Sequence, residues 1–245
     1  MGGRAPAVEG ELHPFARARA VLDRGPVFLR VSVMFGKLFG RKEAAPASAL
    51  PAIRNVTLGR TVWLDTLAWR RLGSERRFPL DRDTLEITAQ GLVDLKDGGF
   101  VHRFYTDDHA MFQAVSDDRE GQRINDVTIF VPWESAYPGS RADREAWGQR
   151  LRARTFTASG LPDYTRFWFG DEAESQDPVT FWEDLHDDRD GVPDRRIFQT
   201  CMLFSRELPG DARELLLAIE QETEDGEVSF EVMLGVPLEV GEFKA

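Results

Sequence analysis

Residues 214–234 read ELLLAIEQETEDGEVSFEVML, and this stretch carries the clearest fold signal in the chain. In its second half, 228–234, apolar side chains occupy every second position, which is the period of a β-strand with one buried face. Asp225-Gly226 stands between the two halves, and an Asp-Gly pair between apolar runs is a strong hairpin signal. We therefore predict a β-hairpin that pairs 214–222 with 228–234.

A helix is the alternative for the first half of this stretch. Asp211 could cap a helix that runs through Glu222, and Leu215 and Ile219 fit helical spacing. The strand is preferred because the alternating segment 228–234 needs a neighbouring strand with which to pair.

Ile197–Arg206 predicts a strand that is buried on both sides. Its apolar side chains alternate between two faces, with Phe198, Met202 and Phe204 on one face and Ile197, Cys201 and Leu203 on the other. Such a run is typical of a central strand covered on both sides. Cys201 is therefore expected to be a buried structural thiol rather than a nucleophile. Shorter alternating runs predict further strands at 85–89, 100–104, 127–131 and 164–170.

Two segments predict helices. Asp65 can cap a short helix over Thr66–Leu72, and Ser140 can cap a longer helix over Ser140–Arg154, with Asp143 in its first turn. Antiparallel hairpins together with two or three helices predict an α+β fold, with a predominantly antiparallel β-sheet and a disordered N-terminal tail.

The chain divides into three parts. Residues 1–33 mix Gly, Pro, Ala and Arg without a sustained period, and we expect a non-globular extension. Residues 34–49 combine a short motif, MFGKLFGRKE, with a linker rich in Pro and Ala. Residues 50–245 are expected to form a single α+β domain. The change in composition favours Met34 over Met1 as the true start.

Charge disfavours nucleic acid as a partner. The formal net charge is −11, although residues 1–47 carry eight Lys or Arg against four Asp or Glu. The remaining body is therefore strongly acidic and should repel phosphate backbones. A single cysteine fits a reducing compartment, and the apolar run Pro26–Phe39 is too short and too charged to span a bilayer. We expect a cytoplasmic protein that can lie at the inner membrane.

The motif at 34–42 is the predicted contact element. It places apolar side chains next to positive ones, so a single amphipathic turn could lie on an anionic membrane or dock in the groove of a protein partner. A frayed terminus with chance phenylalanines is the alternative. The contact residues are Phe35, Lys37, Leu38, Phe39, Arg41 and Lys42.

Enzyme signatures are missing from the sequence: it has no HExxH, GxSxG, P-loop or GxGxxG motif in a suitable context. The best catalytic candidates are Asp107 and Asp108, with His102 and His109 nearby, since paired carboxylates and an imidazole can bind a divalent cation or perform acid–base chemistry. Ordinary hairpin-turn chemistry is the alternative. No cofactor or metal is expected.

Two charged clusters remain. Asp171–Asp194 contains ten acids and one Arg, which indicates a solvated acidic face or a flexible insertion, or else a docking surface for a basic partner. The Asp187–Gly191 segment fails the calcium-loop pattern because a His and an Ile stand at the first and last ligand positions. Arg70 and Arg71, with Arg76 and Arg77, could contact an anion or lie exposed over the aromatic core.

The chain resembles the YjfK-like bacterial proteins, a family of unknown function, in four motifs and in the order in which they occur. The motifs are MFGKLFGRKE, TVWLDTL (61–67), HRFYTDD (102–108) and CMLFSR (201–206), so the resemblance runs from Met34 to the C-terminus. It implies a chain that opens at the first motif, and it supplies no catalytic residues. It also implies an accessory protein encoded beside a phage-shock-protein-A-like coat protein, a small membrane protein and an ATP-grasp ligase, which points to membrane or envelope stress.

Two functions follow as hypotheses. The first is a non-catalytic adaptor whose body binds a protein partner, while residues 34–42 contact a membrane or that partner. The alternative is an enzyme with a carboxylate or metal site around Asp107 and Asp108.

Overall fold

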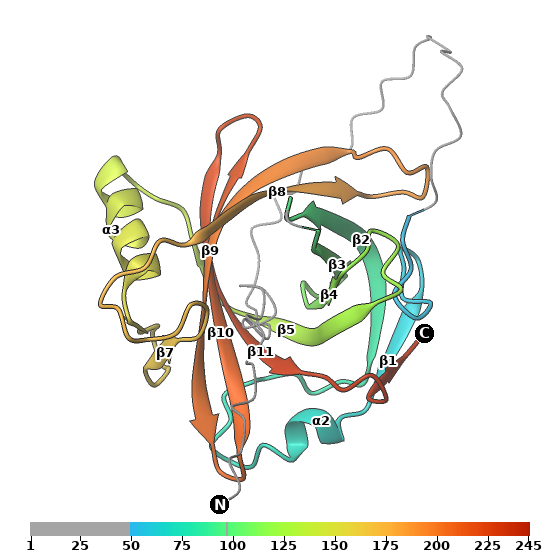
Figure 1. Ribbon diagram of the computed structural model, residues 1–245, viewed down its shortest axis with the longest axis horizontal. Helices are drawn as coiled ribbons and strands as arrows, with labels where there is room; N and C mark the ends of the chain where they lie inside the picture. Colours follow the sequence, from blue (N-terminus) through green and yellow to red (C-terminus); the bar gives the residue numbers. More distant parts are fainter. Residues whose placement is uncertain (1–49, 97) are drawn as a thin grey trace, which may run out of the picture.

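The structure is a computed structural model that describes residues 50–96 and 98–245 (Figure 1). The predicted tail at 1–33 and the predicted motif and linker at 34–49 lie outside these residues. The elements, in chain order, are β1 (Thr61–Leu64), α2 (Leu67–Arg70), β2 (Thr84–Asp94), β3 (Phe100–Thr106), β4 (Met111–Ser116), β5 (Ile124–Ala136), α3 (Arg141–Arg152), β6 (Thr155–Phe156), β7 (Tyr164–Arg166), β8 (Val179–His186), β9 (Arg195–Leu208), β10 (Ala212–Thr223), β11 (Val228–Pro237) and β12 (Phe243–Lys244).

Eight of these strands close into an antiparallel β-barrel, in the order β2-β3-β4-β5-β11-β10-β9-β8. β8 completes the ring because it pairs with β9 along one edge and with β2 along the other, where Gln90 lies opposite His186 and Val93 opposite Glu183. Figure 1 shows β8 running across from the β9 side to reach β2. Closure satisfies the strand edges that an open sheet would expose.

The predicted α+β class is therefore wrong. Helices α2 and α3 lie outside the barrel, and the sheet buries its apolar face by curling on itself instead of being covered by a helical layer (Figure 1). The strand that decides this, β8, lies inside Asp171–Asp194, where the acidic composition indicated a solvated face or an insertion. The acidic composition did not indicate a strand, because acidic side chains are expected in solvent. In β8 these side chains are divided between the barrel interior and solvent.

The opening hairpin is confirmed. β10 and β11 pair from Leu215 opposite Gly235 to Glu222 opposite Val228, so the helix alternative is wrong. Gly226 has a φ of +82°, a left-handed conformation that glycine adopts without a Cβ penalty. The Ser140 cap is also confirmed, since its side chain accepts a hydrogen bond from the Asp143 backbone N–H. The short helix forms as well, over Leu67–Arg70.

The barrel wall is packed on both sides, as Ile197–Arg206 predicted. Directly opposite residues share a face of a sheet, so the β9 register places Cys201 and Leu203 toward the interior and Met202 and Phe204 outward. Outside, Trp147 of α3 stacks on Phe230 with ring centroids 4.7 Å apart. Of the segment predicted as a strand at 164–170, only β7, Tyr164–Arg166, is extended.

Neither helix in the described part of the chain has the length and apolar character of a membrane-spanning segment.

Candidate functional site

A buried polar network occupies the barrel interior. Arg103 of β3 donates from Nη1 to Glu183 Oε2 on β8 (2.8 Å) and to Gln199 Oε1 on β9 (2.7 Å). Its Nε donates to Gln113 Oε1 on β4 (3.0 Å). Arg103, Glu183, Gln113 and Gln199 are all buried. One guanidinium thus ties together strands from both sides of the point where the barrel closes.

Glu183 is satisfied from three directions. Besides Arg103, its Oε1 accepts from the Tyr105 hydroxyl (2.6 Å) and its Oε2 from the Gln199 side-chain amide (2.6 Å). Burial by itself would lower the pKa of Arg103, but the opposing contributions, of which the charge of Glu183 is the largest, together raise the pKa, so the guanidinium stays charged. Burial raises the pKa of Cys201 to about 12, so this thiol is neutral. The interior is filled by the protein's own bonded side chains, as in other small barrels.

Gly91 of β2 makes room for this network. It lies opposite both Arg103 and Leu185 in the register, on the interior face between β3 and β8. A Cβ at position 91 would stand 1.8 Å from Glu183 Oε1 and 2.8 Å from its Cδ. No real Cβ approaches an oxygen so closely, so any other residue must displace the carboxylate.

Gly91→Ala should therefore lower the free energy of unfolding by about 1–3 kcal/mol, the usual cost of overpacking a core. Gly241→Ala is the matched control, because a Cβ there meets nothing within 4 Å and the backbone is unstrained. Urea unfolding followed by tryptophan fluorescence measures both. Equal stability of the two variants would show that Glu183 can move without cost.

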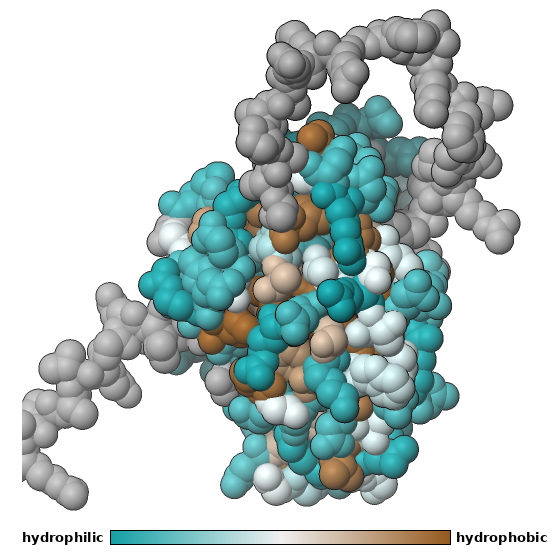
Figure 2. Space-filling model, turned by 90° about the vertical axis from the view of Figure 1, so that its right-hand side faces the viewer, coloured by the Kyte–Doolittle hydropathy of each residue, from teal (hydrophilic) through white to brown (hydrophobic). Residues whose placement is uncertain are grey.

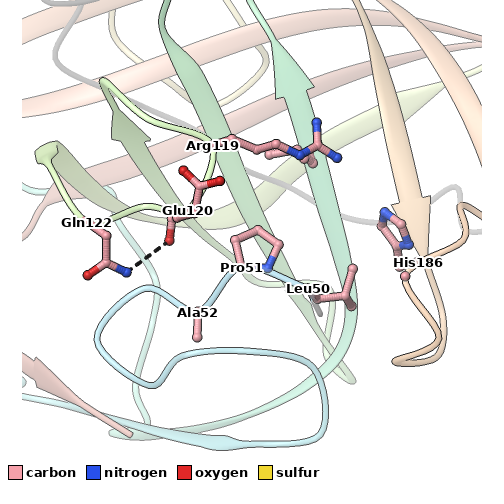
Figure 3. Close-up of a pocket in the computed structure, with 9 residues that line it drawn as sticks. Leu50, Pro51, Ala52, Arg119, Glu120, Gln122 and His186 are labelled. Carbon is pink, nitrogen blue, oxygen red and sulfur yellow. Dashed lines mark hydrogen bonds between the residues drawn. The ribbon is translucent and has the colours of Figure 1, made fainter. Parts of the chain in front are cut away.

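A pocket of about 300 Å³ lies outside the barrel wall (Figure 3). Leu50, Pro51 and Ala52 form one part of its lining, and Figure 3 shows Glu120 and Gln122 on one side of Pro51, with His186 on the other. The remaining lining residues are Leu92, Arg119 and Gly191. The pocket is therefore built from the β4–β5 loop, the end of β8 and the first described residues.

The polar groups of this pocket suit binding. His186 Nδ1 lies 3.1 Å from the Val192 carbonyl, which can only accept, so Nδ1 donates this hydrogen bond. Arg119 adds a guanidinium, Glu120 a carboxylate and Gln122 an amide beside apolar Leu50 and Pro51. Such a lining can hold a mixed apolar and polar side chain.

His102 lies on the same outer face, directly opposite Leu92 of the pocket. Ser116 Oγ donates to the Asp118 carbonyl (2.6 Å), so it accepts from His102 Nε2 at 2.8 Å. Nδ1 is then unprotonated, and it is buried without a hydrogen-bond partner among the described residues. Burial lowers the pKa of His102 to about 4, against the opposing pull of Asp118. His102 is held neutral, which is a structural role.

Acid should destabilise the protein through His102. The unfolded chain protonates this ring near pH 6.5, whereas the folded chain resists protonation until about pH 4. The unfolded state thus binds more protons in that window, and the free energy of unfolding should fall by about 3 kcal/mol as pH drops across it. Asp118 and Glu120 favour the proton, and Arg119 opposes it.

The measurement is urea unfolding from pH 7 to pH 4. His102→Asn should remove this part of the pH dependence, while His109→Asn, in an exposed turn, should keep it because the buried ring remains. An unchanged slope in His102→Asn would contradict the assignment.

The outer face of β8 and β9 exposes aromatic surface. Trp182 is 42% exposed, and its ring lies 5.3 Å from that of Phe198 and 5.1 Å from the Arg196 guanidinium. Arg196 also pairs with Asp184 (2.6 Å). Val192 in the following loop is exposed as well. We name Trp182, Val192, Arg196 and Phe198 the β8–β9 face.

The structure does not bring the predicted catalytic residues together. Asp107 and Asp108 occupy the β3–β4 turn and both pair with Arg82. Asp108 Oδ1 also accepts from the Thr106 hydroxyl (2.6 Å), and His109 has the positive φ of a turn residue. His102 lies earlier on β3 and contacts Ser116 instead. In the described residues, no group of three or more His, Cys, Asp or Glu is placed to hold a metal.

The other predicted residues are dispersed. Arg71 pairs with Glu242 (2.5 Å) and Arg70 is exposed at the end of α2. Asp187 and Arg195 pair across the β8–β9 loop. The predicted contact residues, Phe35 to Lys42, lie outside the described part of the chain.

Sequence reasoning missed the interior network and the pocket. Arg103 and Tyr105 stand in the motif HRFYTDD, and period-two alternation places them on the face opposite His102 and Phe104. Local alternation gave no signal that this polar face is the one that points into the interior. Their partners, Glu183 and Gln199, lie 80 and 96 residues away along the chain.

Figure 2 shows a mainly hydrophilic surface with scattered hydrophobic areas on the side that carries β1.

The fold and the site together define a closed antiparallel β-barrel with a hydrogen-bonded polar interior and a pocket on its outer wall. The chain belongs to the family described as protein of unknown function (DUF2491), whose model matches residues 34–244. It is 26% identical over 198 residues to the uncharacterized protein YjfK of Escherichia coli (strain K12). These aligned residues cover 79% of this chain and 87% of that protein. The resemblance seen in the sequence is thereby confirmed. No solved structure matches the chain.

Proposed function

We propose that this protein is a non-catalytic accessory protein that binds a protein partner through the β8–β9 face. The proposal rests on Trp182, which is 42% exposed and contacts Phe198 and Arg196. Tryptophan and arginine are the residue types that most often dominate binding energy at interfaces. A rigid barrel wall presents them without an ordering cost.

Residues 34–42 supply a second contact in this proposal. Their mix of phenylalanine and positive charge suits an anionic membrane or the partner. The protein then works in the cytoplasm, peripheral to the inner membrane, and the process suggested by its resemblance is membrane or envelope stress. It needs no cofactor. The contacts of Asp107 and Asp108 favour a turn over a catalytic site at this position, because both carboxylates are engaged by Arg82 and Asp108 also by its own turn.

Trp182→Ser tests the proposal. Immobilised full-length chain captures proteins from a bacterial lysate, and the captured protein is then purified and its Kd measured directly. We expect Trp182→Ser to weaken that Kd at least about tenfold, since interface tryptophans commonly contribute 2 kcal/mol or more. Trp63→Ser is the matched control, because Trp63 is 51% exposed on β1, away from this face.

Unchanged Kd in Trp182→Ser, or equal losses in both variants, would overturn the β8–β9 face as the binding surface. A parallel flotation assay with anionic vesicles compares the full chain with one that lacks 34–42. Equal binding of both chains would remove the membrane contact from the proposal.

A further inference from the structure

We propose that the β8–β9 face is also an internal seat for residues 34–42 of the same chain. The segment and a partner would then compete for one surface, so partner binding would release the basic motif. This inference deepens the proposed function and takes its regulatory meaning from it.

The described part of the chain begins close to the β8–β9 face. Leu50, the first described residue, lines the wall pocket together with His186 at the end of β8. Trp182 lies four residues back along the same strand and on the same outward face, roughly 13 Å away at about 3.3 Å per residue. The pocket and the β8–β9 face are therefore continuous along β8.

The linker is long enough to reach Trp182. Phe39 and Leu50 are eleven residue steps apart, and a chain of that length spans up to about 36–40 Å. The Pro- and Ala-rich linker therefore covers the distance to Trp182 with length to spare. A tethered segment within reach has an effective concentration on the order of millimolar, so even a weak contact is populated.

The segment 34–42 and the β8–β9 face are chemically complementary. The segment 34–42 carries Phe35, Leu38 and Phe39 beside three cations and no acid. The β8–β9 face offers apolar Trp182, Phe198 and Val192. Trp182 and Val192 lie within Asp171–Asp194, which holds ten acids and one Arg, and Glu183 is the one of these acids that is buried in the barrel interior. Arg195 and Arg196 pair with two of these acids, whereas Asp188 and Asp190 remain exposed in the loop. Apolar contact with an opposite-charge rim is typical of helix-in-groove recognition.

Photo-crosslinking of the full-length chain tests the seat. A benzoylphenylalanine at Phe39 is irradiated in purified protein, and the products are mapped by mass spectrometry. We expect crosslinks concentrated on 179–200. The same photo-residue at Phe15, in the preceding segment, is the matched control and should not concentrate there. Mixing isotope-labelled and unlabelled protein separates crosslinks within one chain from those between copies.

Two variants sharpen the outcome. Trp182→Ser should cut the yield on 179–200 at least about fivefold, while Trp63→Ser should not. The triple variant Lys37→Glu/Arg41→Glu/Lys42→Glu, which leaves the barrel untouched, should cut it similarly, and added salt should weaken the wild-type yield.

Crosslinks elsewhere, a Phe15 pattern equal to that of Phe39, or crosslinks only between copies would overturn the internal seat. Because no partner is present, this result is independent of the capture assay. If the internal crosslink is absent but the partner still binds the β8–β9 face, the proposed function stands and the internal seat is wrong. If the internal crosslink forms but no partner binds, the internal seat stands and the partner is removed from the proposal.

Discussion

Arg103→Met is expected to lower the free energy of unfolding by about 3–5 kcal/mol, because it leaves the Glu183 carboxylate buried without its counter-charge. The methionine fills much of the volume of the arginine stem but donates no hydrogen bond. Gln113 and Gln199 lose their donor at the same time. Equilibrium unfolding in urea, read by circular dichroism, measures the loss.

A double-mutant cycle assigns this cost to the ion pair. Glu183→Met alone should be similarly destabilising, and the double variant should cost clearly less than the sum, since both buried charges are then gone. The control is Arg141→Met at the exposed Arg141–Glu145 pair on α3, which should stay close to wild type. Additive single losses would mean that the two residues act separately.

Glu214→Ala should have an effect of comparable size, about 3–5 kcal/mol, since it leaves several buried donors unsatisfied. Glu214 is buried, and its carboxylate accepts from the Arg77 and Phe78 backbone N–H groups (2.6 and 2.7 Å) and from the Tyr164 hydroxyl (2.7 Å). Arg206 donates to it as well (2.9 Å). This residue fastens the loop before β2 and the short strand β7 to the barrel wall.

Glu214→Gln separates charge from hydrogen bonding. It keeps one acceptor oxygen in place, so it should lose clearly less stability than Glu214→Ala. Arg213→Ala, next in sequence but paired with Glu207 at the surface, is the control and should unfold near wild type. Hydrogen exchange at the Arg77 and Phe78 amides gives a local measurement. Protected amides in Glu214→Ala would show that the loop is held by other contacts.

The filled interior explains why the proposed contacts lie outside the barrel. Larger barrels can enclose a ligand, but here the space between β3, β8 and β9 is occupied by Arg103, Glu183 and Gln199, which bond to one another. Recognition then falls to side chains on the outer wall, and Trp182 is the most exposed large hydrophobic side chain on β8 and β9.

Local periodicity predicted the helices and strands in which each face keeps the same degree of burial from one end to the other. The β10–β11 hairpin follows from one alternating run and an Asp-Gly turn, and α3 follows from the Ser140 cap. These signals need only neighbours in sequence, so they survive without knowledge of the fold. The two-sided burial of β9 was predictable for the same reason.

Local sequence signals were therefore enough to predict the hairpin, the central strand, the capped helix and the family resemblance. Closure of the sheet could not be predicted in this way, because it depends on β8. The burial of Glu183 on that strand is explained only by its contacts with Arg103 and Gly91, which are distant in the sequence. The pocket on the wall has the same origin, since it joins residues near 50, 120 and 186. Such contacts between distant segments have no local period, and a buried charge looks solvated in the sequence until its partner is placed beside it.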